Sequence, residues 1–288
     1  MVAALGSLAS LLGDPTVQTV VLGSALLGAT AGALGTFAVL RRQSLLGDAM
    51  SHAALPGVVM GYFVSGGRHL GAILIGALLA GLAAALFALF LSRQPRIKEE
   101  AALGAALSLG FALGVVLLTV AQKQATASHA GLDTFLFGQA AATLRSDLVW
   151  LGGLAAVAGL ILAVLWRQAK LATFDRDFAA VSGVAVPRIE ALLTALLAFA
   201  IVIGLQLVGV VLMSSLVVAP AVAARQWSGS IAGMVLLAGA IGLVSAVIGA
   251  VLSALSPGLS TGPLVVLVAT AAVAISLVFG RPSVRGAN

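Results

Sequence analysis

The chain has 288 residues, of which 61% are hydrophobic and 8% are charged, and its mean hydropathy is +1.18. Soluble globular domains carry about 25% charged residues, so this composition excludes that class and indicates an integral membrane protein. The formal charge of +6 does not indicate a nucleic-acid partner, because the basic residues are scattered through the short segments between apolar runs. The sequence holds no cysteine, which excludes disulfides and thiolate metal sites.

Apolar runs near the ~20 residues that a helix needs to cross a bilayer repeat along the chain. They predict an all-α polytopic bundle, one transmembrane domain over residues 1–288, with an uncleaved segment before the first span. Small residues such as those of Gly28–Gly32 favour close helix packing in lipid. The expected spans are 17–40, 49–66, 70–91, 101–121, 147–166, 191–212, 230–253 and 261–280.

The stretch 191–227 is too long for one perpendicular helix and contains Gly209 and Pro220. It predicts a helix followed by a re-entrant or broken piece, so the span count is eight or nine. Pro220 frees a backbone carbonyl, which is tolerated where a neighbour or a water-filled route satisfies it. The candidate pathway or gate residues are Ser51, Ser214, Ser215 and Pro220. The alternative for this stretch is plain helix packing with a kink.

Basic residues between the spans favour the cytoplasmic side of a cell inner or plasma membrane. They are Arg41, Arg42, Arg93, Arg96, Lys98, the basic residues of 167–188, Arg281 and Arg285. The C-terminal tail reaches the same side only if residues 213–227 return partway across the membrane, and Arg225 supports such a return. The sequence thus predicts a multi-pass protein whose larger connecting loop lies inside the cell.

Asp48 and His52 lie where the chain enters the second predicted span, four residues apart, so a helix places both on one face. Ionisable side chains are costly at membrane depth and usually serve a pathway, a partner or an ion. A carboxylate and a neutral imidazole are donors suited to manganese, iron or zinc. Two ligands are too few for a tight site, but a symmetric homodimer would supply four. The alternative is that Asp48 caps the helix while His52 hydrogen-bonds a neighbouring helix.

Residues 174–183 form the second distinctive segment, inside the largest basic loop. Its apolar and small residues stand at helical spacings and are Phe174, Phe178, Ala179 and Gly183. A short helix that docks in a groove of a partner protein has this pattern. The alternative is a solvated connector in which Asp175 or Asp177 caps a helix.

The sequence contains no G-x-x-x-x-G-K-[ST] phosphate loop, so any energy from ATP must come from another subunit. It has three histidines and no HExxH motif, so we do not expect an enzyme.

The run from Arg41 to Gly57 resembles the permease subunit of the manganese/zinc/iron family of ATP-binding cassette importers. Further stretches resemble that family's motifs in the same order, so the likeness covers nearly the whole chain; they are Phe137–Gly138, 174–183, 209–225 and 261–263. The resemblance implies a homodimeric permease, two cytoplasmic ATPase subunits, and an extracellular or periplasmic protein that delivers the metal. It also implies that Asp48 and His52 meet the metal, and that residues 174–183 are the coupling helix, with Asp175 among its contacts.

On this interpretation the chain holds no cofactor of its own: the metal is its substrate, and ATP is used by the partner subunit. Ligation by Asp and His suits Mn²⁺, Zn²⁺ and Fe²⁺ alike, so the choice of metal stays open. The rival hypothesis is a secondary transporter or channel driven by an ion gradient, which needs no docking loop and would stay active without residues 174–183.

Overall fold

The structure is a computed structural model that describes residues 14–67, 69–92, 94–123, 145–256 and 259–280. These residues form eleven helices and no strand, so the predicted all-α bundle is confirmed. The helices are α2 (Pro15–Leu40), α3 (Ser44–Ser65), α4 (Leu70–Ser92), α5 (Glu99–Gln122), α8 (Arg145–Val164), α9 (Trp166–Phe174), α10 (Arg176–Val181), α11 (Val186–Leu207), α12 (Val210–Arg225), α13 (Ile231–Leu255) and α14 (Thr261–Phe279). Residues 1–13 of the predicted N-terminal segment, Arg93, Phe137–Gly138, Arg281 and Arg285 lie outside the described residues.

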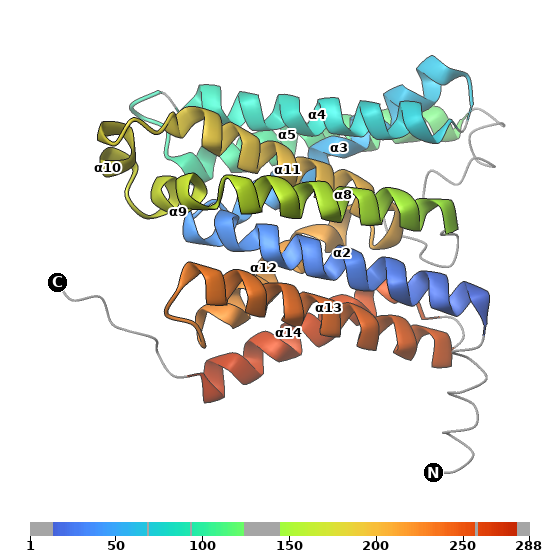
Figure 1. Cartoon of the computed structure of the whole chain (residues 1–288). Helices are drawn as coiled ribbons and strands as arrows, with labels where there is room; N and C mark the ends of the chain where they lie inside the picture. The colour runs from blue at the N-terminus through green and yellow to red at the C-terminus, as the bar shows by residue number, and fades with distance from the viewer. Residues whose placement is uncertain (1–13, 68, 93, 124–144, 257–258, 281–288) are drawn as a thin grey trace, which may run out of the picture.

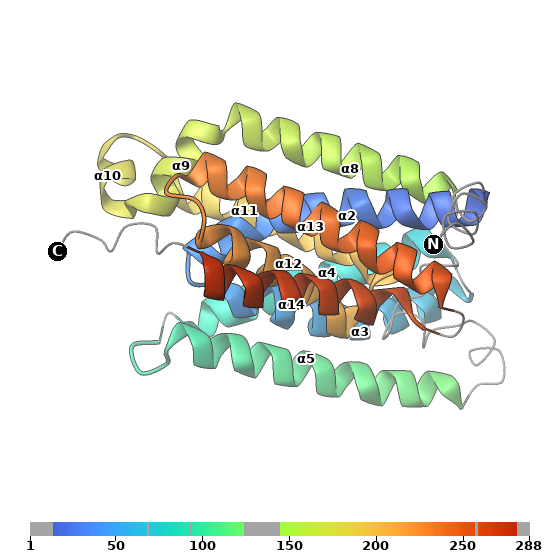
Figure 2. The ribbon, with the colours of Figure 1, turned by 90° about the horizontal axis from the view of Figure 1, so that it is seen from below.

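The long helices lie side by side along one direction, and α9 and α10 lie together at one end of the bundle (Figure 1). Viewed from below, α5 and α8 form opposite edges of the bundle (Figure 2). Helix α2 packs on α13, α12 and α11, while α3 packs on α4, α5 and α12. Helix α3 is therefore covered by neighbours on several sides.

Six of the described helices are long and apolar enough to cross a membrane, namely α2, α4, α5, α11, α13 and α14. The α8–α9 pair, bent by 73°, makes a seventh if it counts as one span. Helix α3 has 22 residues, the length of a span, but Asp48 and His52 lower its apolarity. The described helices thus give six or seven candidate spans, and α3 would be an eighth by its length, so the predicted count of about eight is approximate.

The predicted break in the stretch 191–227 is confirmed, and three predicted boundaries are wrong. Helix α11 ends at Leu207 rather than 212, and the 16-residue α12 begins at Val210. However, α11 begins at Val186 rather than 191, because Pro187 is well tolerated in a first turn. Helix α3 begins at Ser44 rather than 49, so Asp48 lies inside the helix.

Helix α12 returns toward the end of the bundle that carries α9 and α10 (Figure 1). The indole Nε1 of Trp227, just beyond α12, donates to Ser276 Oγ in the last turn of α14 at 2.9 Å. The ends of α12 and α14 therefore lie together. Basic side chains such as Arg41 and Arg176 gather at the same end, which the positive-inside rule makes cytoplasmic.

Glycines set the closest helix contacts. A Cβ atom at Gly28 of α2 would collide with the carbonyl oxygen of Gly242 in α13, and the reverse also holds. Gly57 of α3 and Gly76 of α4 approach each other in the same way. Because apolar burial gives little drive for helix association in lipid, such backbone approach supplies the packing energy, as the Gly28–Gly32 run predicts.

The first prediction follows from the contact between Gly28 and Gly242. Replacing Gly28→Ala forces α2 away from α13, and we expect a loss of about 1–3 kcal/mol of folding free energy, the usual cost of overpacking. Thermal unfolding of the detergent-purified protein measures it. Gly153→Ala on α8 is the matched control, because nothing lies within 4 Å of a Cβ there. Equal melting temperatures for both variants would contradict the packing described.

Candidate functional site

Asp48 occupies the second turn of α3, and the residue in the N-cap position is Gln43. Asp48 therefore does not cap the helix, and that alternative is wrong. Its Oδ1 atom lies 3.3 Å from His52 Nε2, one helical turn further along α3. The Asp48 side chain is 30% exposed and the His52 side chain 15%. The predicted sharing of one helix face is confirmed, and the two groups contact each other directly.

Two neighbouring helices complete the surroundings of this pair. From α12, the Ser214 side chain lies near the Asp48 carboxylate. From α5, the Phe111 ring meets the His52 ring edge-on, with centroids 5.0 Å apart. His52 Nδ1 is buried and has no hydrogen-bond partner among the described residues. The imidazole is thus held by Asp48 and an aromatic ring, rather than by a hydrogen bond to another helix.

The break between α11 and α12 brings Ser214 to Asp48. Gly209 has φ 90° and ψ 163°, a backbone conformation that is essentially restricted to glycine. After this residue the chain turns back, and the buried Met213 packs over Gly204 of α11. Ser214, the next residue, then faces α3. The glycine that predicted a broken span therefore also positions a residue of the site.

The structure brings only one of the four predicted pathway residues to Asp48. Ser51 is fully buried and its hydroxyl donates to the carbonyl of Gly47 in its own helix, at 2.7 Å. Pro220 lies within the unbroken α12 and packs beside glycines of α2 and α13. Ser215 is half-buried on α12. In this conformation Ser214 alone joins the ionisable pair.

Residues 174–183 contain the predicted short helix. Asp175 ends α9 and caps α10, accepting a hydrogen bond from the Phe178 amide at 2.9 Å. The capping role of Asp175 is therefore confirmed, and the cap fixes the start of α10. Ala179 is fully buried in a cluster with residues of α9 and α11, and Gly183, at φ 81°, ends the turn.

Three apolar side chains of this segment point away from the bundle. Phe174 is 81% exposed, Phe178 58% and Val181 89%. They lie at the end with the charged loops, where the lipid that would cover apolar groups is not expected. Exposed apolar side chains rimmed by charges mark a protein-interaction site. We call these three residues the α10 patch.

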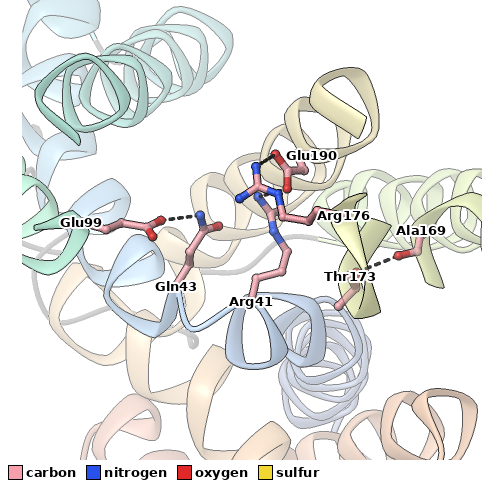
Figure 3. A network of polar contacts seen from close by, with 7 residues as sticks. All are labelled: Arg41, Gln43, Glu99, Ala169, Thr173, Arg176 and Glu190. Atoms are coloured by element: carbon pink, nitrogen blue, oxygen red, sulfur yellow. Dashed lines mark hydrogen bonds and ion pairs between the residues drawn. The ribbon is translucent and has the colours of Figure 1, made fainter. Parts of the chain in front are cut away.

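A network of charged and polar side chains lies between the starts of α10 and α11 and the turn after α2 (Figure 3). Arg176 Nη2 lies 2.8 Å from Glu190 Oε2, and Arg41 Nη2 lies 4.0 Å from Glu190 Oε1. Gln43 Nε2 donates to Glu99 Oε1 at 2.6 Å. Burial lowers the pKa of Arg41, and Glu190 opposes the shift; arginine nevertheless stays protonated in proteins.

Sequence reasoning missed this network, because it read Arg41 only as a sign of topology. The one available signal was a lone carboxylate, Glu190, near the start of an apolar helix. The groups border a cavity of about 600 Å³ between α4, α5 and the start of α11.

Together, the bundle with its ionisable pair and its exposed α10 patch define a polytopic helical permease of the cell membrane. Residues 13–280 match the profile of the ABC 3 transport family, and the chain belongs to that family. It is 46% identical over 274 residues to the zinc transport system membrane protein TroC of Treponema pallidum (strain Nichols), covering 95% of this chain and 92% of TroC.

The chain is also similar to the manganese transport system membrane protein MntC of Bacillus subtilis (strain 168), with 43% identity over 264 residues that cover 92% of this chain and 61% of MntC. Among solved structures, PsaBC from Streptococcus pneumoniae in complex with Fab matches with a TM-score of 0.85 and 30% identity, over 97% of both chains. The family and fold that the sequence motifs implied are confirmed, and the chain is a multi-pass permease subunit of an ABC transport system.

The second prediction concerns Gly209. Replacing Gly209→Ala strains the backbone by about 1–3 kcal/mol, which we expect to lower the melting temperature and to move Ser214 away from Asp48. Thermal unfolding and the transport rate report the two effects. Gly229→Ala is the matched control, because this loop glycine has open space around its Cβ position and no positive φ. Wild-type stability in Gly209→Ala would contradict the described break.

Proposed function

We propose that the chain forms the pathway of an ATP-driven importer for a divalent transition metal, Mn²⁺, Zn²⁺ or Fe²⁺, working as a homodimer. The observation that carries the proposal is the Asp48–His52 pair within a membrane-spanning segment. Relatives named for zinc and for manganese transport support the substrate class.

The spacing of the pair suits one shared ion. Bonds from a metal to carboxylate oxygen and imidazole nitrogen are about 2.1 Å, so two such ligands lie about 3.0 Å apart at a right angle and about 3.4 Å apart in a tetrahedron. The observed separation of Asp48 Oδ1 and His52 Nε2 is 3.3 Å. An ion can therefore bind both atoms with little movement of either side chain.

The site in one chain is weak, which suits transport. The described residues hold no group of three or more His, Cys, Asp or Glu side chains placed to bind a metal. A second copy of the chain across a two-fold axis doubles the donors to two carboxylates and two imidazoles. A transport site must release its ion as readily as it accepts it, so few protein ligands are an advantage.

The proposal includes two partner proteins. The α10 patch docks in a cytoplasmic ATP-binding cassette subunit, which binds and hydrolyses ATP, and the chain itself holds no cofactor. On the opposite side, an extracellular or periplasmic metal-binding protein delivers the ion. Binding and hydrolysis of ATP then shift the permease between outward-open and inward-open states.

The third prediction tests the pair. In cells that express the complete importer, we expect Asp48→Asn and His52→Ala to lower accumulation of the transported metal by ~10-fold or more. Loss of a side chain that hydrogen-bonds a metal ligand typically costs at least that much, and loss of the ligand itself costs more. Elemental analysis of Mn, Zn and Fe measures it. The controls are Glu100→Gln and His69→Ala, which alter exposed groups of the same chemistry. Unchanged accumulation in both pair variants, at equal protein levels, would refute the metal site.

The fourth prediction tests the α10 patch. We expect Phe178→Asp and Val181→Asp to abolish co-purification with the ATPase subunit and uptake, while the protein remains folded, because both side chains are exposed. Gln94→Asp, an exposed change in the α4–α5 loop, serves as the control. Persistent uptake without the ATPase subunit would favour the gradient-driven transporter instead.

A further inference from the structure

We propose that Glu190 is a positioning residue that links movement of α10 to α3, through Arg176 on one side and Arg41 on the other. This inference rests on the proposed function, because it assumes that α10 moves with an ATPase subunit. It adds a specific connection between that movement and the Asp48–His52 pair.

The two carboxylate oxygens of Glu190 face arginine side chains from two different elements. Oε2 meets Arg176, the first residue of α10, and Oε1 faces Arg41, which ends α2. The Glu190 side chain is only 17% exposed. Within the described part of the chain, these two ion pairs are the only side-chain polar links between α10 and the α2–α3 turn. Displacement of α10 therefore acts on that turn through Glu190, in addition to the apolar packing of Ala179 in the cluster that also contains Phe37 of α2.

The turn transmits displacement to the pair because it is short and internally bonded. The Gln43 amide donates to the Ala38 carbonyl at 2.9 Å, and the Leu46 amide to the Gln43 carbonyl at 3.0 Å. Arg42, at φ 59°, is the only non-glycine residue with a positive φ in the described chain. Asp48 follows ~6 Å along α3 from Ser44, at the rise of 1.5 Å per residue. A shift of the turn thus moves the carboxylate with it.

A parallel connection reaches His52. Gln43, in the same turn, donates to Glu99, the first residue of α5, at 2.6 Å. Helix α5 carries Phe111, whose ring supports the imidazole of His52. The turn is therefore tied to both helices that hold the pair, and its movement changes their relative position.

The two ion pairs differ in a way that allows exchange. Arg176 is 69% exposed, and an exposed ion pair contributes little stability and breaks readily. The Arg41 side chain is 12% exposed, so the loss of its carboxylate partner would cost more stability than the loss at Arg176, because an unpaired buried charge is costly. The adjoining cavity of about 600 Å³ provides room for the Glu190 side chain to move. Release of Arg176 by movement of α10 would thus leave Glu190 free to close on Arg41.

The experiment uses the complete importer in liposomes and measures metal transported per ATP hydrolysed. We expect Glu190→Gln to lower this ratio at least about fivefold, the lower end of typical coupling between sites, while ATP hydrolysis and ATPase co-purification persist. Its melting temperature falls, because the buried Arg41 loses its carboxylate partner. Arg176→Gln, at an exposed position, should give the same loss without a risk to folding, and Arg176→Lys should restore the ratio. The double variant should lose no more than either single one. Glu100→Gln is the matched control.

The outcomes separate the two proposals. Wild-type protein that transports no metal with ATP refutes the proposed function itself. If the wild type transports but Glu190→Gln and Arg176→Gln keep its ratio, only the link through Glu190 is overturned. A loss that appears together with a lost ATPase subunit also overturns it, because Glu190 would then act in assembly.

Discussion

The cost of placing a carboxylate within a membrane-spanning helix is the constraint on which this structure depends. Two polar neighbours of the Asp48 carboxylate reduce this cost: the imidazole of His52 at 3.3 Å and the nearby Ser214 side chain. Neighbouring helices must surround α3 for this to hold, and small residues let them approach. The backbone break at Gly209 then directs α12 toward the pair. A helix too polar to face lipid is thereby stabilised inside the bundle.

The same helix connects the two ends of the proposed transport cycle. Helix α3 begins just after the turn in which Arg41 pairs with Glu190. Its second and third helical turns carry Asp48 and His52. Helix α10 is linked to the α2–α3 turn through Arg176 and Glu190, so a partner bound at the α10 patch acts on the start of α3. The proposed partner there is an ATPase subunit, and membership of the ABC 3 transport family supports that proposal. The proposed metal pathway and the proposed coupling element are thus joined by a few polar contacts.

Sequence patterns predicted what depends on local composition, and missed what depends on distant contacts. Long apolar runs located the spans, and the glycine at 209 located the break in the α11–α12 stretch. The start of α3 was misplaced because Gly47 and Asp48 look like the end of a loop, whereas the buried Leu46 holds that first turn against the bundle. Neither the contact of Ser214 with Asp48 nor that of Arg41 with Glu190 could be predicted, since each joins residues far apart in the chain.

The most direct test of the central claim is the position of the ion in the complete importer, arrested by an ATPase subunit that binds but does not hydrolyse ATP. Loading with Mn²⁺ and locating it by anomalous scattering identifies its ligands. The account predicts an ion bound by the carboxylate of Asp48 and the Nε2 atom of His52, with the same two atoms contributed by a second copy. An ion held in the pathway by other residues, with this pair unoccupied, would contradict it.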